Sequence, residues 1–415
     1  MEQYRKGVRY PPRKRQIYRA TRLPLGSSAI SALFLPMTEL FNKFTDANTL
    51  YKAACNARKD SDWKASTQRF GMSVLQNILS IQNDLRTGKY TQKPFVEFRL
   101  HERGKVRHIK SMYIRDRVVQ RALCDEVLVP CLRPALIYDN GASLEGKGID
   151  FTRNRLQCHL EKFFRQHGNN GYVLKIDFSK FFDNIDHELA LQAVAKYIDD
   201  PLVMDAIQRM VKSFEVDVSA LSDEEIKALE NKPFDSLTHI PSREGRKFLK
   251  RSLGIGSQIS QIIGIFYPTP IDFYCKVKRQ CKYYGRYMDD IYIIHENKEF
   301  LEDVLKGVLE VAKELKLFVN PRKTTITPLR CGFTFMKVRY SYTESGHIVK
   351  RLTPEAFTRE RRRLKSYRRL LDAGRITRQD VRNFYQSFRG AAKRFDNYRS
   401  LRNLDKLYDE LFVQQ

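Results

Sequence analysis

The chain has 415 residues, of which 42% are hydrophobic, and this content is enough to bury a core, which excludes a fibrous or largely disordered protein. Its 75 Lys and Arg residues outnumber its 48 Asp and Glu residues, so the net charge is +27 and a polyanionic partner is expected. A phosphate backbone is the simplest such partner.

The cysteine pattern and the hydropathy exclude two further classes of protein. The seven cysteines include no Cys-x-x-Cys pair and no histidine at metal-ligand spacing, which argues against a zinc module. Their odd number and the lack of an apolar signal core in the basic N-terminus predict reduced thiols and a cytoplasmic location. No apolar run approaches the roughly 20 residues needed to cross a bilayer, so no membrane contact is expected.

A basic arm is predicted at residues 1–26, where Lys and Arg residues are interleaved with tyrosines. Pro11, Pro12 and Pro24 disfavour a helix there. Two interpretations stay open, namely an arm that clasps RNA and a solvated tail. From residue 27 to 95 the apolar residues recur at three- and four-residue spacing, which predicts helices.

A β-hairpin that carries basic side chains is predicted between residues 95 and 109. These side chains are Arg103, Lys105 and Arg107. A solvated basic hairpin is one interpretation of all three. Asp116 and Arg117 are then expected to open a helix that runs to residue 129, and to pin its start by capping and ion pairing.

An apolar run at residues 172–176 ends in Asp177, which is typical of a buried strand that delivers a carboxylate at its exit. Residues 215–253 follow as an insertion whose first half is acidic and whose second half is basic. A solvated helix and loop is the preferred interpretation of the insertion, because charge runs usually face water. A contact with RNA or with another protomer is the alternative.

Asp289 and Asp290 lie between two short β-type runs, rich in Tyr and Ile, that predict strand, tight turn and strand. Side chains alternate along a strand, so adjacent carboxylates can share a ligand only where a turn removes the alternation. Together with Asp177 they could bridge two Mg²⁺ ions about 3.5–4 Å apart, which is the arrangement used for in-line attack on phosphate. The alternative is a structural role in which nearby Arg or Lys residues neutralise the acids.

The C-terminal region after Tyr340 is basic and predicts helices. Arginines crowd the segment 359–369, and a second helix at 378–391 carries Phe384, Tyr385 and Phe388 at helical spacing. That aromatic set is expected to lie in the core, with base stacking as the lesser alternative.

Five blocks of this sequence resemble, in order, the palm motifs of reverse transcriptases of the bacterial group II intron and retron lineage. They are DFSKFFDNIDH at 177–187 for motif A, GIGSQISQ at 254–261 for motif B, YMDD at 287–290 for motif C, NPRKT at 320–324 for motif D and GFTF at 332–335 for motif E. The resemblance covers roughly residues 80 to 340. It implies an α/β (α+β) right-hand polymerase. The segments that it implies are fingers at 27–170, a palm at 171–340 that contains the insertion, and a helical thumb at 341–415.

The resemblance implies RNA-directed DNA polymerase activity by two-metal nucleotidyl transfer. Asp177 and Asp289 are the main expected Mg²⁺ ligands, with the Phe178 carbonyl as a further one, and Mn²⁺ is a substitute ion. Asp290 is expected to contribute charge and to share in metal binding. Lys323 matches the motif D lysine that protonates the leaving pyrophosphate. Pairing of Lys323 at the surface is its alternative.

The same resemblance assigns residues to the incoming nucleotide. Arg107 is the best positional match to the residue that grips the triphosphate. Phe182 occupies the steric-gate position that selects deoxynucleotides, and motif B contributes Ile255, Gly256 and Gln261. Residues 138–143 depart from the family's Arg-containing form, and Lys147 is the candidate to supply the missing charge.

Motif B departs from the common form as well, because Ile255 stands where many reverse transcriptases have Gln. This form is found in enzymes of diversity-generating retroelements and in some defence-associated relatives. Losing an amide there predicts lower copying fidelity.

The remaining expectations concern nucleic acid and biological setting. Residues of the basic thumb helix and of motif E are expected to hold the template and primer. They are Arg361, Arg362, Lys365, Arg368, Gly332 and Phe333. A cognate noncoding RNA template, a primer, the complementary DNA and dNTPs are the implied partners, and a second copy or an accessory protein stays open. Antiphage defence is preferred over a diversity-generating retroelement because of the N-terminal arm, the insertion and the long thumb. A catalytically idle RNA-binding scaffold is the third alternative.

Overall fold

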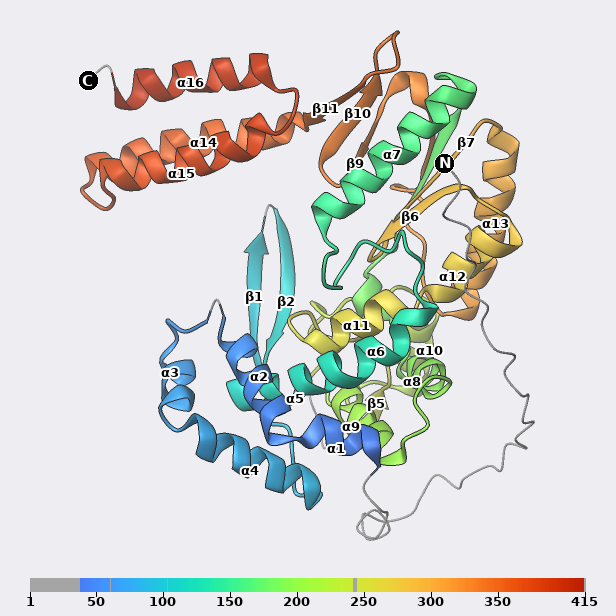
Figure 1. The fold of residues 1–415 in the computed structure, drawn as a ribbon, viewed down its shortest axis with the longest axis vertical. Coiled ribbons are helices and arrows are strands. Elements are labelled where there is room, and N and C mark those ends of the chain that lie inside the picture. Colours follow the sequence, from blue (N-terminus) through green and yellow to red (C-terminus); the bar gives the residue numbers. More distant parts are fainter. Residues whose placement is uncertain (1–37, 60, 103, 242–244, 414–415) are drawn as a thin grey trace, which may run out of the picture.

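The computed structural model describes residues 38–59, 61–102, 104–241 and 245–413, so the predicted arm at 1–26 lies outside the described residues (Figure 1). The described chain is a mixed α/β structure whose sheets are antiparallel, which confirms the predicted fold class. No helix of this described part has both the length and the apolar content of a bilayer-spanning segment.

Helices dominate the N-terminal region, as the apolar spacing predicts. They are α1 (Glu39–Thr45), α2 (Ala47–Arg58), α3 (Ala65–Met72), α4 (Val74–Arg86) and α5 (Ile114–Leu123). Thr38 and Asp46 cap the first two helices by accepting bonds from backbone N–H groups, which satisfies donors that a helix start leaves free. Buried side chains such as Leu50 and Val118 form a core between α2 and α5.

The long helix in this region begins earlier than the sequence predicts. α5 starts at Ile114 with Tyr113 at its N-cap and continues through a π-helical turn (Cys124–Leu128) into α6 (Val129–Leu132). The predicted capping role of Asp116 is wrong, because this fully buried carboxylate accepts hydrogen bonds from Tyr90 Oη (2.8 Å) and Lys93 N (3.2 Å). It therefore holds the preceding loop against the helix.

A β-hairpin projects from these helices towards the C-terminal helices (Figure 1). Its strands, β1 (Val96–Glu102) and β2 (Lys105–Ser111), pair antiparallel with Glu102 opposite Lys105, which confirms the predicted hairpin. β2 also meets the motif B segment, because Lys110 N donates to Ile255 O at 3.0 Å. The hairpin is therefore tied to the centre of the molecule at its base.

A four-stranded antiparallel sheet in the order β6-β7-β3-β8 lies at the centre. Its strands are β3 (Tyr172–Ile176), β6 (Tyr283–Tyr287), β7 (Asp290–His295) and β8 (Thr325–Pro328). The helices around it are α7 (Ile149–His167), α8 (His187–Ala195), α9 (Pro201–Lys212), α11 (Gln258–Phe266), α12 (Thr269–Phe273) and α13 (Lys298–Glu314). The apolar runs that predict β3, β6 and β7 are buried between these helices, as a strand covered on both faces requires.

The insertion folds into more than a helix and a loop. Its helix α10 (Asp223–Glu230) has no buried residue, as a solvated helix should, and begins at a capping box formed by Ser222 and Glu225. Two short strands, β4 (Val216–Asp217) and β5 (Phe248–Leu249), pair across the insertion and enclose a small core with Phe234. The sequence did not predict this core, because its members are far apart in the chain.

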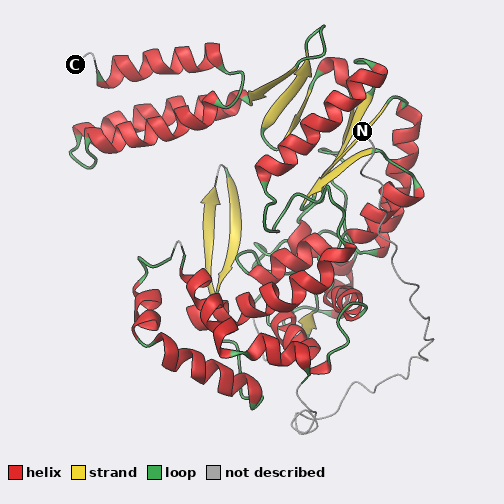
Figure 2. Cartoon of the chain, viewed as in Figure 1, coloured by secondary structure: helices red, strands yellow, loops and turns green. Residues whose placement is uncertain are grey.

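The C-terminal region consists of a small sheet followed by a helical bundle (Figure 2). The sheet contains β9 (Phe333–Phe335), β10 (Val338–Tyr342) and β11 (Ile348–Leu352), and the bundle contains α14 (Pro354–Asp372), α15 (Arg378–Lys393) and α16 (Tyr398–Phe412). Tyr385 is buried, but Phe384 is 41% exposed and stacks on Tyr367 at a ring distance of 5.0 Å. The expected core role is therefore confirmed for Tyr385 and wrong for Phe384.

Candidate active site

The three predicted acids meet at one end of the central sheet. Ile176 pairs with Ile291 across β3 and β7, so continuing this register places Asp177 opposite Asp290. Tyr287 pairs with Asp290, which leaves Met288 and Asp289 as a two-residue turn. Met288 has φ 54°, the sign that a type II′ turn requires at its first central residue. Strand pairing and this turn together bring the carboxylates of two hairpin residues and one neighbouring strand to the same edge.

Burial and the neighbouring negative charges raise the pKa of two of these acids, Asp289 and Asp290. Burial raises the pKa of Asp289 to about 6, and the charge of Asp177 adds to the rise. The pKa of Asp290 is raised to about 7 by burial, then by Asp289 and Asp177. The positive charges of Lys323 and Lys105 oppose both shifts. Burial, more than the balance of nearby charges, therefore sets the pKa of these two carboxyls.

Lys323 lies directly on the first of these acids. Its Nζ is 2.8 Å from one oxygen of Asp177 and 3.1 Å from the other. The backbone holds the motif D segment in this place, since Asn320 N donates to Asp177 O at 2.8 Å and Ser179 N donates to Phe318 O at 2.7 Å. The structure thus brings together Asp177 and Lys323, two residues that are far apart in sequence.

Phe178 is buried, and its backbone faces the acid cluster rather than motif D. It forms an isolated antiparallel bridge with Val319, flanked by the two backbone bonds just described. In such a non-hydrogen-bonded pair, the N–H and C=O of each residue point away from the partner segment. The Phe178 carbonyl is therefore directed away from Val319, as a metal ligand at this position would need.

The chemistry of the donor set fits divalent cations. Carboxylate and carbonyl oxygens are the hard ligands that Mg²⁺ prefers, and a bound cation would favour the ionised form of Asp289 and Asp290, whose pKa values burial raises. Among the described residues, however, no three His, Cys, Asp or Glu side chains converge closely enough to hold an ion. The cation that meets Asp177 here is the Lys323 ammonium, so a metal ion would have to compete with it. The two-metal assignment stays a prediction.

The motif B turn packs against β2 through its glycine. Gly256 has φ 116°, and a Cβ added there would lie 3.1 Å from the Lys110 carbonyl oxygen. Both the backbone angle and the close approach favour glycine. Ile255, whose carbonyl accepts the bond from Lys110 N, is half-buried at the same junction.

A cavity of 880 Å³ lies beside motif B. It is bounded by α2, α5, the segment 143–145 and α11, and it includes two of the predicted nucleotide-binding residues, Gly256 and Gln261. Ser143 donates to Gln261 Oε1 at 3.5 Å across this cavity. None of the three acids lines it, and neither do Arg107, Phe178, Phe182 and Ile255. The predicted nucleotide contacts are thus distributed between the cavity and its surroundings.

Phe182 is the more accessible member of an aromatic pair. Phe181 is buried, whereas Phe182 is half-buried, and their rings meet edge to face at 5.4 Å. Phe182 also packs on Gly264 of α11, where an added Cβ would lie 2.8 Å from the ring. Choosing Phe182 over Phe181 agrees with this difference in burial, while the steric-gate role itself stays a prediction.

Two cations of the hairpin are candidates for the nucleotide contact. The Arg107 side chain is 46% exposed, and its Nε lies 3.8 Å from Glu102 Oε2 in a loose ion pair. Lys105 lies at the tip, and its charge lowers the pKa of both Asp289 and Asp290. The structure therefore adds weight to Lys105, and Arg103 lies outside the described residues.

The predicted nucleic-acid contacts divide into exposed and engaged residues. Arg361, Arg362 and Lys365 are exposed on α14, whereas Arg368 Nη1 donates to Leu411 O at 2.7 Å and ties α14 to α16. In motif E, the Phe333 ring is buried and stacks on Tyr340 at 5.7 Å, so its side chain belongs to the core, and the primer contact of Gly332 and Phe333 stays a prediction. Gly332, with φ 64°, allows the backbone to approach Tyr340 O.

Sequence reasoning missed a buried ion pair beneath the catalytic turn. Arg286 and Asp272 are both fully buried, and their side chains join β6 to α12. The sequence did contain a signal, because the apolar segments of β6 and α12 each carry one charged residue, Arg286 and Asp272, and the two have opposite signs. Charges buried in apolar segments are normally paired.

Comparisons with known proteins agree with this geometry. The family model described as "Reverse transcriptase (RNA-dependent DNA polymerase)" matches residues 92–340. Protein YkfC of Escherichia coli is 24% identical over 286 residues, which are 62% of this chain and 69% of that protein. The putative COX1/OXI3 intron 1 protein of Saccharomyces cerevisiae is 25% identical over 150 residues, which are 35% of this chain but only 17% of the yeast protein.

Two solved structures show weaker likeness. The telomerase of Candida albicans, solved with a fragment of telomeric RNA, gives a TM-score of 0.45 at 12% identity and covers 78% of this chain and 59% of that chain. The apo telomerase of Candida tropicalis gives a TM-score of 0.38 at 16% identity, covering 67% of this chain and 60% of that chain. Likeness at this level does not bear on function.

Proposed function

Because the chain belongs to the reverse transcriptase (RNA-dependent DNA polymerase) family, we propose that it copies an RNA template into DNA by extending a primer 3′-hydroxyl with dNTPs. The observation that carries this proposal is the convergence of Asp177, Asp289, Asp290 and Lys323 at one edge of the central sheet. All four residues fall within the matched segment 92–340. The proposal assigns metal binding to the acids and proton donation to the lysine.

The acids and the Phe178 carbonyl would hold the metal ions. Two Mg²⁺ ions, or Mn²⁺ in their place, would lower the barrier to attack of the primer 3′-hydroxyl on the α-phosphate and stabilise the leaving pyrophosphate. Asp177 and Asp289 supply the main ligands, and Asp290 adds charge. Lys323 holds a proton at Nζ for the leaving group, and it must leave Asp177 to deliver that proton.

Nucleotide selection is assigned to residues around motif B and the hairpin. Phe182 presents a ring beside the ribose and disfavours a 2′-hydroxyl. Gln261 and Gly256 contribute to the nucleotide side of the cavity, and Arg107, with Lys105 as a second candidate, binds the triphosphate. The exposed cations of α14, Arg361, Arg362 and Lys365, grip the template and primer backbone.

A cognate noncoding RNA is the proposed template, and antiphage defence in a bacterial cytoplasm is the proposed setting. Support comes from three features that lengthen the chain, namely the basic arm at 1–26, the insertion with its own core and the three-helix C-terminal bundle. The Ile255-Gly256 form of motif B favours a diversity-generating retroelement as the second candidate. The neighbouring genes distinguish the two, since a template repeat with a variable target gene is expected only for the retroelement.

Sequencing of co-purified nucleic acid tests the proposal. Wild-type protein and an Asp289→Asn, Asp290→Asn variant are purified from cells and incubated with Mg²⁺ and all four dNTPs, the amides being matched in size to the acids. The proposal expects the same RNA with both proteins and complementary DNA with the wild type alone. RNA bound by both without DNA from either would instead support an RNA-binding scaffold.

A further inference from the structure

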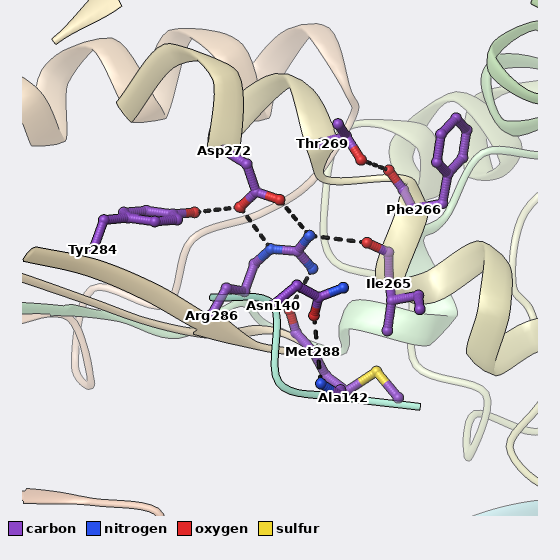
Figure 3. Close-up of polar contacts among 9 residues, drawn as sticks. All are labelled: Asn140, Ala142, Ile265, Phe266, Thr269, Asp272, Tyr284, Arg286 and Met288. Atoms are coloured by element: carbon purple, nitrogen blue, oxygen red, sulfur yellow. Dashed lines mark hydrogen bonds and ion pairs between the residues drawn. The ribbon is translucent and has the colours of Figure 1, made fainter. Parts of the chain in front are cut away.

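The turn that carries Asp289 is held from below by a single buried guanidinium (Figure 3). Arg286 Nη1 donates to the Met288 carbonyl at 3.1 Å. Met288 has φ 54°, a conformation that is unfavourable for a residue with a side chain and that persists only where its surroundings fix it. Because the Met288 carbonyl belongs to the peptide that enters Asp289, the bond from Arg286 fixes the orientation of that peptide.

The same guanidinium holds the end of the motif B helix. Arg286 Nη2 donates to the Ile265 carbonyl at 2.9 Å, in the last turn of α11 (Figure 3). The last carbonyls of a helix lack partners within the helix and carry the negative end of its dipole, so a cation is favoured there. Thr269 Oγ1 donates to the next carbonyl, that of Phe266. Arg286 therefore connects α11, which carries motif B, to the motif C turn.

Asp272 and Tyr284 keep this cation in place. Arg286 Nε donates to Asp272 Oδ1 at 2.8 Å and Nη2 donates to Oδ2 at 2.5 Å, while Tyr284 Oη donates to Oδ1. Burial alone would lower the pKa of Arg286, but Asp272 raises it, so the guanidinium stays charged. The planar guanidinium donates to Asp272, Met288 O and Ile265 O in three different directions. A lysine ammonium is a single point and cannot reach all three partners.

The backbone of Arg286 makes a third connection that does not depend on its side chain. Its N–H donates to Asp139 O at 3.1 Å and its carbonyl accepts from Gly141 N at 2.9 Å. This loop continues to Ser143, which lines the cavity beside motif B. Side-chain substitution should leave this backbone pairing in place.

We propose that Arg286 is a positioning residue for nucleotidyl transfer, whose guanidinium sets the orientation of Asp289 relative to motif B. This inference rests on the proposed polymerase function. A merely structural role is the alternative, and it makes a different prediction. Buried ion pairs can often be replaced by apolar residues of similar volume without loss of stability, so a structural pair should be replaceable without loss of rate.

The test compares an Arg286→Met, Asp272→Leu double variant and Arg286→Lys with wild type. Thermal unfolding is measured together with single-turnover incorporation of dTTP on poly(rA)·oligo(dT) with Mg²⁺. We expect the double variant to unfold cooperatively but below the wild-type temperature, because Tyr284 Oη and the Met288 and Ile265 carbonyls lose their partners. Its incorporation rate should fall about 10- to 100-fold, since small misplacements at a reacting centre have such effects. The dTTP dissociation constant should change by less than about 3-fold, because the backbone pairing remains.

Arg286→Lys keeps a positive charge beside Asp272 but loses the planar guanidinium, so its incorporation rate should also fall. Arg251→Met is the matched control, because Arg251 is likewise buried, its Nη1 donates to the Leu229 carbonyl near the end of α10 at 3.1 Å, and its guanidinium lies over the Phe318 ring. It should lower the unfolding temperature yet keep the rate within about 2-fold. A wild-type rate in the folded double variant would overturn the inference. A wild-type rate in Arg286→Lys would also overturn it. This variant decides between the two roles if the double variant fails to fold. Inactive wild-type protein would instead overturn the proposed function.

Discussion

The raised pKa values at Asp289 and Asp290 give the metal-free protein a stability that depends on pH. A carboxyl whose pKa is raised on folding binds more protons in the folded state, so the free energy of unfolding falls as pH rises from the unfolded pKa towards the folded one. The window runs from about 4 to the folded values of about 6 and about 7. The destabilisation is complete above that window.

Asp290→Asn should therefore stabilise the metal-free protein at pH 8 and have little effect at pH 4.5. In EDTA, the unfolding temperature of the wild type should fall relative to that of the variant as pH rises through this window. Each kcal/mol of lost stability should lower it by about 2–4 °C. The difference between the two unfolding temperatures at each pH removes the contribution of titrating groups that both proteins share. Parallel curves for the two proteins would show that Asp290 is not perturbed.

Lys323 is predicted to act in two opposed ways, as a proton donor and as a competitor for the metal site. Lys323→Met should lower the incorporation rate about 10- to 100-fold because the donor is lost, while the Mg²⁺ concentration for half-maximal rate falls because Asp177 is released. Lys323→Arg keeps a cation beside Asp177 but is a poorer acid, so it should lose rate and keep the wild-type Mg²⁺ requirement. A Met variant with an unchanged requirement would contradict the competition.

At the scale of elements, motif B and the hairpin act as one unit because Gly256 lets their backbones approach. Gly256→Ala would add a Cβ 3.1 Å from Lys110 O at φ 116°, so the turn should move away from β2 and the dNTP dissociation constant should rise about 10-fold or more. Gly88→Ala is the matched control, since its φ is 68° but no atom lies within 4 Å of the added Cβ. It should reduce stability alone. Equal effects of both variants on dNTP binding would contradict the coupling.

The elements that could be predicted from sequence are those whose signal is local. The apolar runs of β3, β6 and β7 and the turn between Tyr287 and Asp290 identify strands without any knowledge of their partners. Asp272 and Arg286 escaped notice because their pairing depends on how α12 packs on β6, which neither segment specifies alone. The burial of the Phe333 ring was not predicted for a related reason, since an aromatic beside a glycine has the same local pattern whether it faces a primer or Tyr340.

At the scale of the whole molecule, a net charge of +27 predicts strong but sequence-independent binding to nucleic acid. A Lys or Arg side chain contributes to nucleic-acid binding only where it is exposed, unpaired and on the face that contacts the duplex. Arg361, Arg362 and Lys365 meet the first condition on α14, in the bundle that faces the tip of the hairpin (Figure 1). Other cations are exposed elsewhere, so net charge alone does not locate the binding surface.

Replacing Arg361, Arg362 and Lys365 with Gln should weaken binding to an RNA–DNA duplex similarly for different sequences. Each lost phosphate contact should also reduce the slope of log affinity against log salt by about 0.7 to 0.9, because fewer counterions are released on binding. Fluorescence anisotropy with two unrelated duplexes at several salt concentrations measures both quantities. The matched control replaces Lys298, Lys306 and Lys313 of α13 with Gln, which removes the same net charge from a helix on another side of the molecule (Figure 1). If the grip is local to α14, the control keeps nearly the wild-type slope; equal slopes in both triple variants would mean that the overall charge, and not the C-terminal bundle, holds the duplex.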